Sequence, residues 1–188
     1  KDLLGRLIEQ LPHYDIYNQN FSPEITNWLP FYWKGFEQTT RYTYRLLKLS
    51  DSEFLWSGFQ DKIKTDIRNA IKQGVSVERS SDINAFLDIN ELTFLRQGIK
   101  PPYKRSYVKR IFEACQKNEA GAIFLARGKD GRIHAGNLLV WNESCAYYLM
   151  GGGDPELRNS GATSLVMWEA IQFASTVSRI FDFEGSMM

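Results

Sequence analysis

Four side chains near the end of the chain carry the chemistry of proton transfer. Asp182 and Glu184 lie two residues apart in a strand-like run, and alternation along a strand would place both carboxyl groups on one face. Tyr147 and Tyr148 are consecutive in another strand-like run, 144–150. A carboxylate can accept a proton from a nucleophile, and a phenol can donate one to a leaving group. We therefore take these four as candidate catalytic residues, with an exposed strand end as the alternative interpretation of the two acids.

A glycine-rich loop that leads into a helical pattern separates the tyrosines from the acids. Gly151 to Gly153 are expected to end the strand, because glycine weakens strand interiors and permits positive φ. From Thr163 the pattern is helical, and a helix N-terminus offers free N–H groups and partial positive charge to an anion. An ordinary strand-to-helix turn is the alternative. The residues expected to contact a phosphate-bearing ligand are Met150, Gly151, Gly152, Arg158, Asn159, Ser160, Gly161, Ala162 and Thr163.

Regular patterns around this loop predict the elements that would position it. Apolar residues three or four apart predict helices, and alternating runs separated by turn residues predict an antiparallel meander. The expected helices cover 51–59, 62–74, 83–97, 105–117 and 163–174, and the expected strands cover 75–79, 122–127, 132–141, 144–150 and 180–186. This order predicts an α/β (α+β) fold with a mixed, mostly antiparallel sheet and helices on both sides.

The segment before residue 50 holds two further strand-like runs. Residues 13–21 alternate, and residues 39–49 are rich in Thr, Tyr and Leu, so both runs predict strands. Arg41 and Tyr42 lie in the second run and are candidate substrate contacts. A core role for the aromatic residues and a solvated strand for the charges are the alternative.

A basic helix and a proline-containing loop add candidate substrate contacts. Arg68 and Asn69 lie outside the apolar stripe of the helix at 62–74, and arginine binds phosphate or carboxylate groups through two parallel hydrogen bonds. Arg96 and Tyr103 flank the loop that follows the helix at 83–97, which its prolines keep extended and which could form a lip over a substrate. A merely solvated surface is the alternative in both places.

The loop before the last helix resembles a known ligand-binding motif. The run Arg158-Asn-Ser-Gly161-Ala162-Thr163 is similar to the coenzyme A pyrophosphate loop of the GNAT acyltransferase superfamily, Arg/Gln-x-x-Gly-x-Gly/Ala. Thr163 stands where the last small residue of that motif is expected. The usual P-loop and dinucleotide-binding glycine patterns are not present in this stretch.

Two other segments resemble one branch of this superfamily, the Fem-type peptidoglycan-bridge aminoacyltransferases and their bacterial acyltransferase relatives. The run Lys64-Thr-Asp-Ile-Arg68-Asn69-Ala-Ile-Lys72-Gln-Gly74-Val75 is similar to the Arg-x-x-Ile-Arg-Lys-Ala-x-Lys-x-Gly-Val segment of that branch. Trp33-Lys-Gly-Phe36 resembles the junction between the two halves of such proteins. The resemblance extends from about Trp33 to the end of the chain.

This resemblance implies a GNAT-type fold and the transfer of an acyl or aminoacyl group to an amine. The implied donor is an acyl-CoA such as acetyl-CoA, with aminoacyl-tRNA as the alternative, and a cell-wall precursor is a possible acceptor. A GNAT-like domain is expected at 51–188 and a partial GNAT-like half at 1–50. A GNAT-like binding module without turnover is the competing hypothesis, because Thr163 departs from the motif and the catalytic base is not obvious.

Composition limits the other functional classes. The net charge of +1 argues against a large nucleic-acid footprint, so a tRNA would have to contact a local basic surface. Two histidines and two cysteines give little material for a metal site or a Ser-His triad, and we expect no metal. The two lone cysteines predict buried thiols in a reducing cytoplasm. No apolar run has the roughly 20 residues of a membrane-spanning helix.

Overall fold

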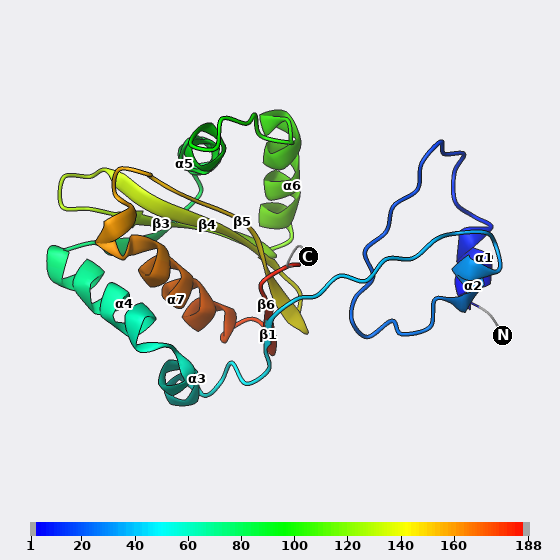
Figure 1. The fold of residues 1–188 in the computed structure, drawn as a ribbon, viewed down its shortest axis with the longest axis horizontal. Helices are drawn as coiled ribbons and strands as arrows, with labels where there is room; N and C mark the ends of the chain where they lie inside the picture. The colour runs from blue at the N-terminus through cyan, green and yellow to red at the C-terminus, as the bar shows by residue number, and fades with distance from the viewer. Residues whose placement is uncertain (1–2, 186–188) are drawn as a thin grey trace. The chain divides into compact units, whose positions relative to one another are not determined.

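A six-stranded sheet organises most of the chain, as the computed structural model, which describes residues 3–185, makes visible (Figure 1). The strands are β1 Arg45–Leu46, β2 Ser76–Ser80, β3 Gly121–Arg127, β4 Ile133–Trp141, β5 Cys145–Gly153 and β6 Ile180–Asp182. They lie in the order β1-β6-β5-β4-β3-β2. Each neighbouring pair is antiparallel except β5 and β6, which are parallel. The predicted meander of β3, β4 and β5 is therefore confirmed.

Helices cover both faces of this sheet (Figure 1). They are α3 Ser52–Gly58, α4 Asp61–Gln73, α5 Ile83–Leu95, α6 Arg105–Lys117 and α7 Ala162–Ala174, with the 3₁₀ turn η1 at Arg158–Ser160. Helix α4 follows its apolar stripe and ends at Gly74, whose φ of +81° is the left-handed conformation that favours glycine. The predicted mixed fold with helices on both sides is confirmed.

The core consists of two clusters of buried side chains, one on each face of the sheet. Phe124 and Leu139 pack with residues of α4 and α7, whereas Ile123, Leu125 and Leu138 pack with residues of α5 and α6. Alternation along β3 and β4 sends successive side chains to opposite clusters. Because both faces are covered, β3 is buried from Gly121 through Ala126.

The chain divides into two compact units, with the boundary between Arg41 and Tyr42. Residues 42–50 group with the second unit because β1 pairs with β6, so the division falls before the predicted boundary at residue 50. The regular structure of residues 3–41 consists of the short helices α1 Leu3–Ile8 and α2 Leu29–Tyr32. The assignment of residues 1–50 to a partial GNAT-like half stays a prediction.

One predicted strand in this part of the chain was wrong, and another was predicted much too long. The run 13–21 is irregular, because Tyr14 and Tyr17 pack against each other and against Phe36 instead of pairing with a strand. The run 39–49 contributes only a bridge at Tyr42 and the two residues of β1, because β6 is itself only three residues long. Alternation alone therefore overestimated strand content where the partner was short or missing.

The glycine run does not end its strand, which corrects another prediction. Strand β5 continues through Gly153, with Gly151, Gly152 and Gly153 opposite Asn137, Gly136 and Ala135 of β4. Gly136 of β4 is closely packed: a Cβ there would lie 2.9 Å from the Leu125 side chain and 3.3 Å from that of Ile89. Among the described residues, no helix has the length and apolar character needed to cross a membrane.

Candidate active site

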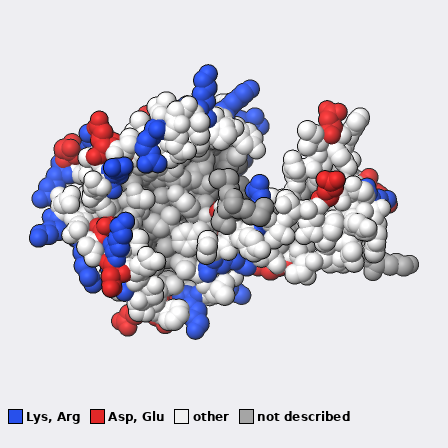
Figure 2. All heavy atoms as spheres, in the orientation of Figure 1, with Lys and Arg blue, Asp and Glu red and all other residues white. Residues whose placement is uncertain are grey.

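The parallel strands β5 and β6 form a fork at the centre of the site. They pair only at Cys145↔Ile180, Ala146↔Phe181 and Tyr147↔Asp182, and β6 then ends while β5 continues to Gly153. The β6-facing edge of β5 is therefore not paired with β6 beyond Tyr147. Figure 2 shows a hollow of largely uncharged atoms on this side of the second unit, between the layer of α5 and α6 and the layer of α7, with lysines and arginines around its rim.

A bulge in β5 shapes the wall of this hollow. Leu139 lies opposite Tyr148 and Leu138 lies opposite Met150, so Leu149 has no residue opposite it on β4. A bulge redirects side chains relative to strict alternation. Tyr148 packs with the cluster on the α7 side, whereas both Leu149 and Met150 line a pocket on the α5–α6 side. Strict alternation along the run 144–150 does not predict this bulge.

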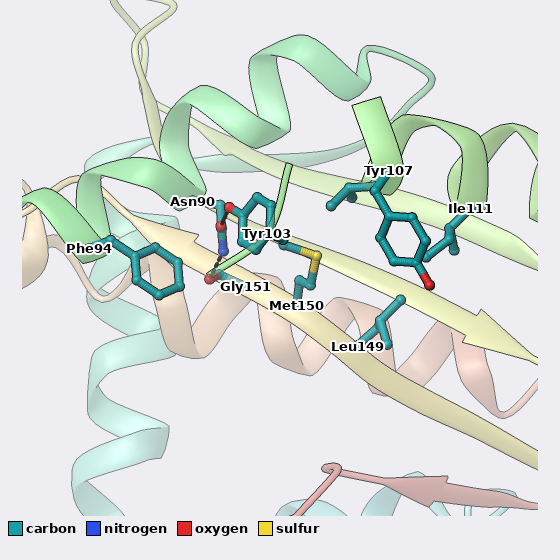
Figure 3. A pocket seen from close by; sticks show the side chains of 9 residues that line it. Asn90, Phe94, Tyr103, Tyr107, Ile111, Leu149, Met150 and Gly151 are labelled. Carbon is teal, nitrogen blue, oxygen red and sulfur yellow. Dashed lines mark hydrogen bonds between the residues drawn. The ribbon is translucent and has the colours of Figure 1, made fainter. Parts of the chain in front are cut away.

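A pocket of about 370 Å³ lies between β5, α5, α6 and the loop that joins the two helices (Figure 3). Its lining residues are Asn90, Phe94, Tyr103, Tyr107, Val108, Ile111, Leu149, Met150 and Gly151. Three of them, Tyr103, Met150 and Gly151, are among the predicted contacts, and the structure brings them together. The loop at 98–103 was predicted to form a substrate lip, and its last residue does border the pocket.

A chain of hydrogen bonds fixes the floor of the pocket. The Asn90 side-chain amide donates to the Gly151 carbonyl at 2.6 Å, and the Tyr103 hydroxyl donates to Asn90 Oδ1 (Figure 3). Asn90 is 3% exposed, so its amide would be costly to bury without these partners. Burial, followed by the charge of Glu91, raises the pKa of Tyr103 and keeps its phenol protonated. Sequence reasoning missed Asn90, because nothing in the helical pattern at 83–97 distinguishes it from an ordinary polar residue of a helix.

The two candidate acids have different surroundings. Asp182 is buried, accepts hydrogen bonds from the Thr43 hydroxyl and the Glu184 N–H, and pairs with Arg45, whose Nε lies 3.5 Å from Oδ2. Glu184 follows β6 with a φ of +51° and has an exposed side chain overall. Partial burial of its carboxyl group, and then the charge of Asp182, raise the pKa of Glu184. Asp182 is thus held by the protein, whereas Glu184 is available to a ligand.

The two candidate tyrosines lie at the point where the fork opens. Tyr147 is opposite Asp182 in the last parallel pair, and Tyr148 is the first residue beyond it. A Cβ on Gly151 would lie 1.8 Å from the Tyr148 hydroxyl oxygen, so the phenol occupies the space that a side chain at Gly151 would need. Burial raises the pKa of Tyr148, and its phenol therefore stays protonated at neutral pH.

The predicted phosphate loop forms η1 and the first turn of α7. Arg158, Asn159 and Thr163 are exposed, whereas Ser160 is buried and its hydroxyl accepts the Ala162 N–H at 3.3 Å. Gly161 has a φ of +75°, and a Cβ there would lie 2.1 Å from the Asp66 carbonyl oxygen of α4. The packing of α4 against the loop therefore accounts for the glycine.

The first turn of α7 keeps anion-binding potential. The first hydrogen bond of the helix to the loop runs from the Leu165 N–H to the Gly161 carbonyl. In the described part of the chain, the N–H groups of Thr163 and Ser164 donate to no protein acceptor. Thr163 stands where the motif has a smaller Gly or Ala. Its hydroxyl oxygen lies 3.5 Å from the position of a Cβ on Gly153, so the side chain is directed toward β5.

An ion-pair network holds the turn between β5 and η1. Arg132 contacts Asp154 at 2.6 Å and Glu156 at 2.5 Å, and Asp154 also accepts the Glu156 N–H at 2.9 Å. Asp154 is 5% exposed, so Arg132 compensates a buried charge. Sequence reasoning missed this network, because its two ends are far apart in the sequence.

Five predicted substrate contacts lie outside the pocket lining. Arg68 and Asn69 are exposed on α4, and the Arg68 guanidinium lies 5.7 Å from the centre of the Trp56 ring. Arg96 is exposed at the end of α5. Tyr42, at the start of the second unit, is 63% exposed, and Arg41 belongs to the first unit. The substrate roles of these residues stay predictions.

The sequence model of the acetyltransferase (GNAT) domain family matches residues 57–185, which include the whole fork and the loop before α7. The chain belongs to the GNAT family. The resemblance to the GNAT superfamily is thereby confirmed, and the sheet with one parallel pair among antiparallel neighbours is the GNAT sheet of this chain. The binding of a phosphate by residues 158–163 stays a prediction. No curated protein sequence matches the chain.

Solved structures similar to this GNAT chain extend the comparison to the Fem-like fold. A crystal structure of FemX has a TM-score of 0.69 at 17% identity, covering 77% of this chain and 52% of FemX. The C-terminal domain of a putative lysylphosphatidylglycerol synthetase from Agrobacterium fabrum has a TM-score of 0.56 at 13% identity, covering 78% of this chain and 46% of that one. L-PGS from Bacillus licheniformis has a TM-score of 0.52 at 11% identity, with coverages of 85% and 50%. The chain spans about half the length of these structures.

Proposed function

We propose that this GNAT domain transfers an acyl group from an acyl-CoA to an amine. The observation that carries the proposal is the fork, where β5 extends past the end of β6 and can pair with an extended ligand that carries amide groups. The first turn of α7 lies next in the chain and offers its N–H groups to the phosphates of such a donor. The match to the acetyltransferase family supports a coenzyme A donor.

The chemistry requires few protein groups. The amine nitrogen attacks the thioester carbonyl carbon and forms the new C–N bond, and the amine proton passes to the Glu184 carboxylate. The C–S bond then breaks, and the thiolate leaves with a proton from Tyr148 or Tyr147. A raised pKa suits Glu184 to accept a proton near neutral pH, and the neutral phenol of Tyr148 suits proton donation. Holding the two substrates in line supplies the remaining rate enhancement.

Thermal denaturation with acetyl-CoA tests this proposal. A donor that binds only the folded chain should raise the melting temperature by roughly 5–10 °C at a hundred times its Kd. Arg158→Ala should weaken the effect because it removes an exposed cation of the phosphate loop, whereas Arg110→Ala, on the exposed side of α6, should not. The absence of a saturable shift in the wild-type chain would contradict the coenzyme A donor.

Aminoacyl-tRNA is the second candidate donor. The fold similarity to FemX favours it, together with the exposed cations Lys62, Arg68 and Lys72 on α4. Lys64 is less available, because its ammonium group donates to the Ser57 carbonyl at 3.0 Å. If tRNA binds here, affinity should fall steeply with salt concentration. Replacing Arg68 and Lys72 together should make the plot of log affinity against log salt less steep, by the amount expected for the loss of about two phosphate contacts. Binding that is indifferent to ionic strength would exclude this donor.

Two further parts of the proposal concern the cellular compartment and the acceptor. Cys115 and Cys145 are free thiols whose pKa values are raised by burial, which fits a protein of the reducing cytoplasm. A cell-wall precursor amine is one acceptor class, by the Fem-like resemblance.

A binding module without turnover is the competing function, and it predicts saturable binding of acetyl-CoA with no release of coenzyme A thiol over a panel of amines. No group of three or more potential metal ligands occurs among residues 3–185.

A further inference from the structure

We propose that the pocket beside β5 binds an uncharged, apolar arm of one of the two substrates, either the acyl chain of the donor or an apolar part of the amine acceptor. The substrate role rests on the proposed function, whereas the binding of an apolar group to the pocket rests on the pocket alone. The Fem-like resemblance does not predict such a preference, since it points to a polar cell-wall precursor.

The wall of the pocket is composed of uncharged and largely apolar side chains. None of its nine lining residues is an Asp, Glu, Lys, Arg or His, and three are aromatic. The rings of Phe94 and Tyr103 meet edge to face, with centroids 6.0 Å apart. Leu149 from the bulge of β5 points toward Tyr107 and Ile111 of α6, so an apolar surface closes the pocket from both sides (Figure 3). Ligand sites lined in this way bind apolar groups by removing their surface from water.

The polar groups on the floor of the pocket are already partnered. The Gly151 backbone carbonyl accepts from the Asn90 side-chain amide, and Asn90 Oδ1 accepts from the Tyr103 hydroxyl. A polar or charged ligand would therefore have to compete with these bonds while losing its own water, and burial of an unpaired charge is costly. An apolar arm loses nothing by this arrangement.

The mouth of the pocket exposes apolar surface in the absence of a ligand. Tyr107 is 59% exposed and Leu149 is 38% exposed. A volume of about 370 Å³ holds on the order of a dozen water-sized groups, at roughly 30 Å³ for each in the liquid. The pocket therefore suits an arm of about six to ten heavy atoms better than an acetyl group.

The position of the pocket connects it to the reaction. Leu149, Met150 and Gly151 belong to the part of β5 that extends beyond β6, which is the part proposed to pair with the donor. An arm in the pocket would therefore be attached within a few atoms of the reacting carbonyl or amine. Both substrates meet this condition, and their dependence on chain length distinguishes them.

The test compares chain length in both substrates. Calorimetry would measure the binding of acetyl-CoA and octanoyl-CoA, and the transfer assay would compare ethylamine with octylamine. Each methylene that enters the pocket should improve binding about 4-fold. If the arm is the acyl chain, octanoyl-CoA should bind at least about 10-fold more tightly than acetyl-CoA; if it belongs to the acceptor, octylamine should show the preference in kcat/KM.

Variants tie the preference to the pocket. Ile111→Trp fills the pocket and should remove the chain-length preference, whereas Arg110→Trp places the same side chain on the exposed side of α6 and should keep it. Tyr107→Glu adds a charge at an exposed position of the mouth, where folding should be unaffected, and should weaken the preference as well.

A neutral probe separates this inference from the proposed function. Octanamide needs no coenzyme A site, and it should bind the wild-type chain but not Ile111→Trp. If octanamide binds in this way while acetyl-CoA does not, the apolar pocket stands and the acyl-CoA function fails. If octanamide does not bind and neither substrate series depends on chain length, the inference is overturned.

Discussion

At the scale of single residues, the two acids at the end of β6 have surroundings that suit different roles. The Asp182 carboxylate has three partners in the protein, namely Thr43, Arg45 and the Glu184 N–H. Its lone pairs are largely committed, so it fits a positioning residue that holds the start of the next segment. Glu184 has a raised pKa and an exposed side chain, which are the properties of a general base that must meet a substrate.

The first prediction concerns the pH dependence of acyl transfer with Glu184 as the general base. The base must be ionised, so kcat/KM should fall as the pH is lowered through the pKa of Glu184. Because that pKa is raised, the fall should occur at a higher pH than for an ordinary glutamate. Glu184→Gln should lower the rate by about 10²–10⁴-fold and remove this acidic limb.

Glu143→Gln provides the matched control, since Glu143 is exposed in the turn before β5. Its pH profile should equal that of the wild-type chain. If Glu184→Gln also keeps the wild-type rate and profile, the base lies elsewhere and the assignment is wrong.

At the scale of secondary-structure elements, features that depend on local sequence patterns were predicted better than features that depend on long-range contacts. The helix at 105–117 and the end of α4 at Gly74 follow from apolar periodicity and one glycine, and the structure has both. The bulge at Leu149, the Asn90–Gly151 hydrogen bond and the Arg132–Asp154 ion pair join residues far apart in the sequence or depend on strand register. A single sequence has no signal for such pairings, so the pocket could not be predicted.

The second prediction compares two glycines of β5 that differ in how closely they are packed. A Cβ on Gly152 would lie 2.4 Å from the Asn90 Cα of α5, whereas a Cβ on Gly153 would meet only contacts of 3.5 Å. Gly152→Ala should therefore push α5 away and destabilise the chain by about 1–3 kcal/mol. Gly153→Ala, in the same strand, should change the free energy of unfolding by less than about 1 kcal/mol.

Urea denaturation of the two variants would measure this difference. Because Asn90 also donates to Gly151, Gly152→Ala should weaken octanamide binding as well, and Gly153→Ala should not. Equal stability of the two variants would show that α5 yields without cost, and the glycine would then have another explanation.

At the scale of the whole molecule, the two units differ in how much core they contain. In residues 3–41, Phe31 and Pro30 are the buried residues, and the aromatic rings around them form a small cluster. Chains of about 40 residues rarely fold alone without disulfides or metals. The second unit contains the sheet, both large core clusters and the fork.

The last prediction is that residues 42–188 fold on their own and that residues 42–47 are needed for this. A chain beginning at Tyr42 should keep a cooperative thermal transition within a few degrees of the full chain, because it keeps the whole sheet. A chain beginning at Lys48 loses Thr43 and Arg45, which leaves the buried Asp182 without two partners and removes β1 from the sheet. Loss of one partner of a buried ion pair costs about 3–5 kcal/mol, so this shorter chain should melt well below the other two. Calorimetry on the three chains measures the effect, and equal melting of the two truncated chains would show that β1 and its contacts to Asp182 contribute nothing to the fold.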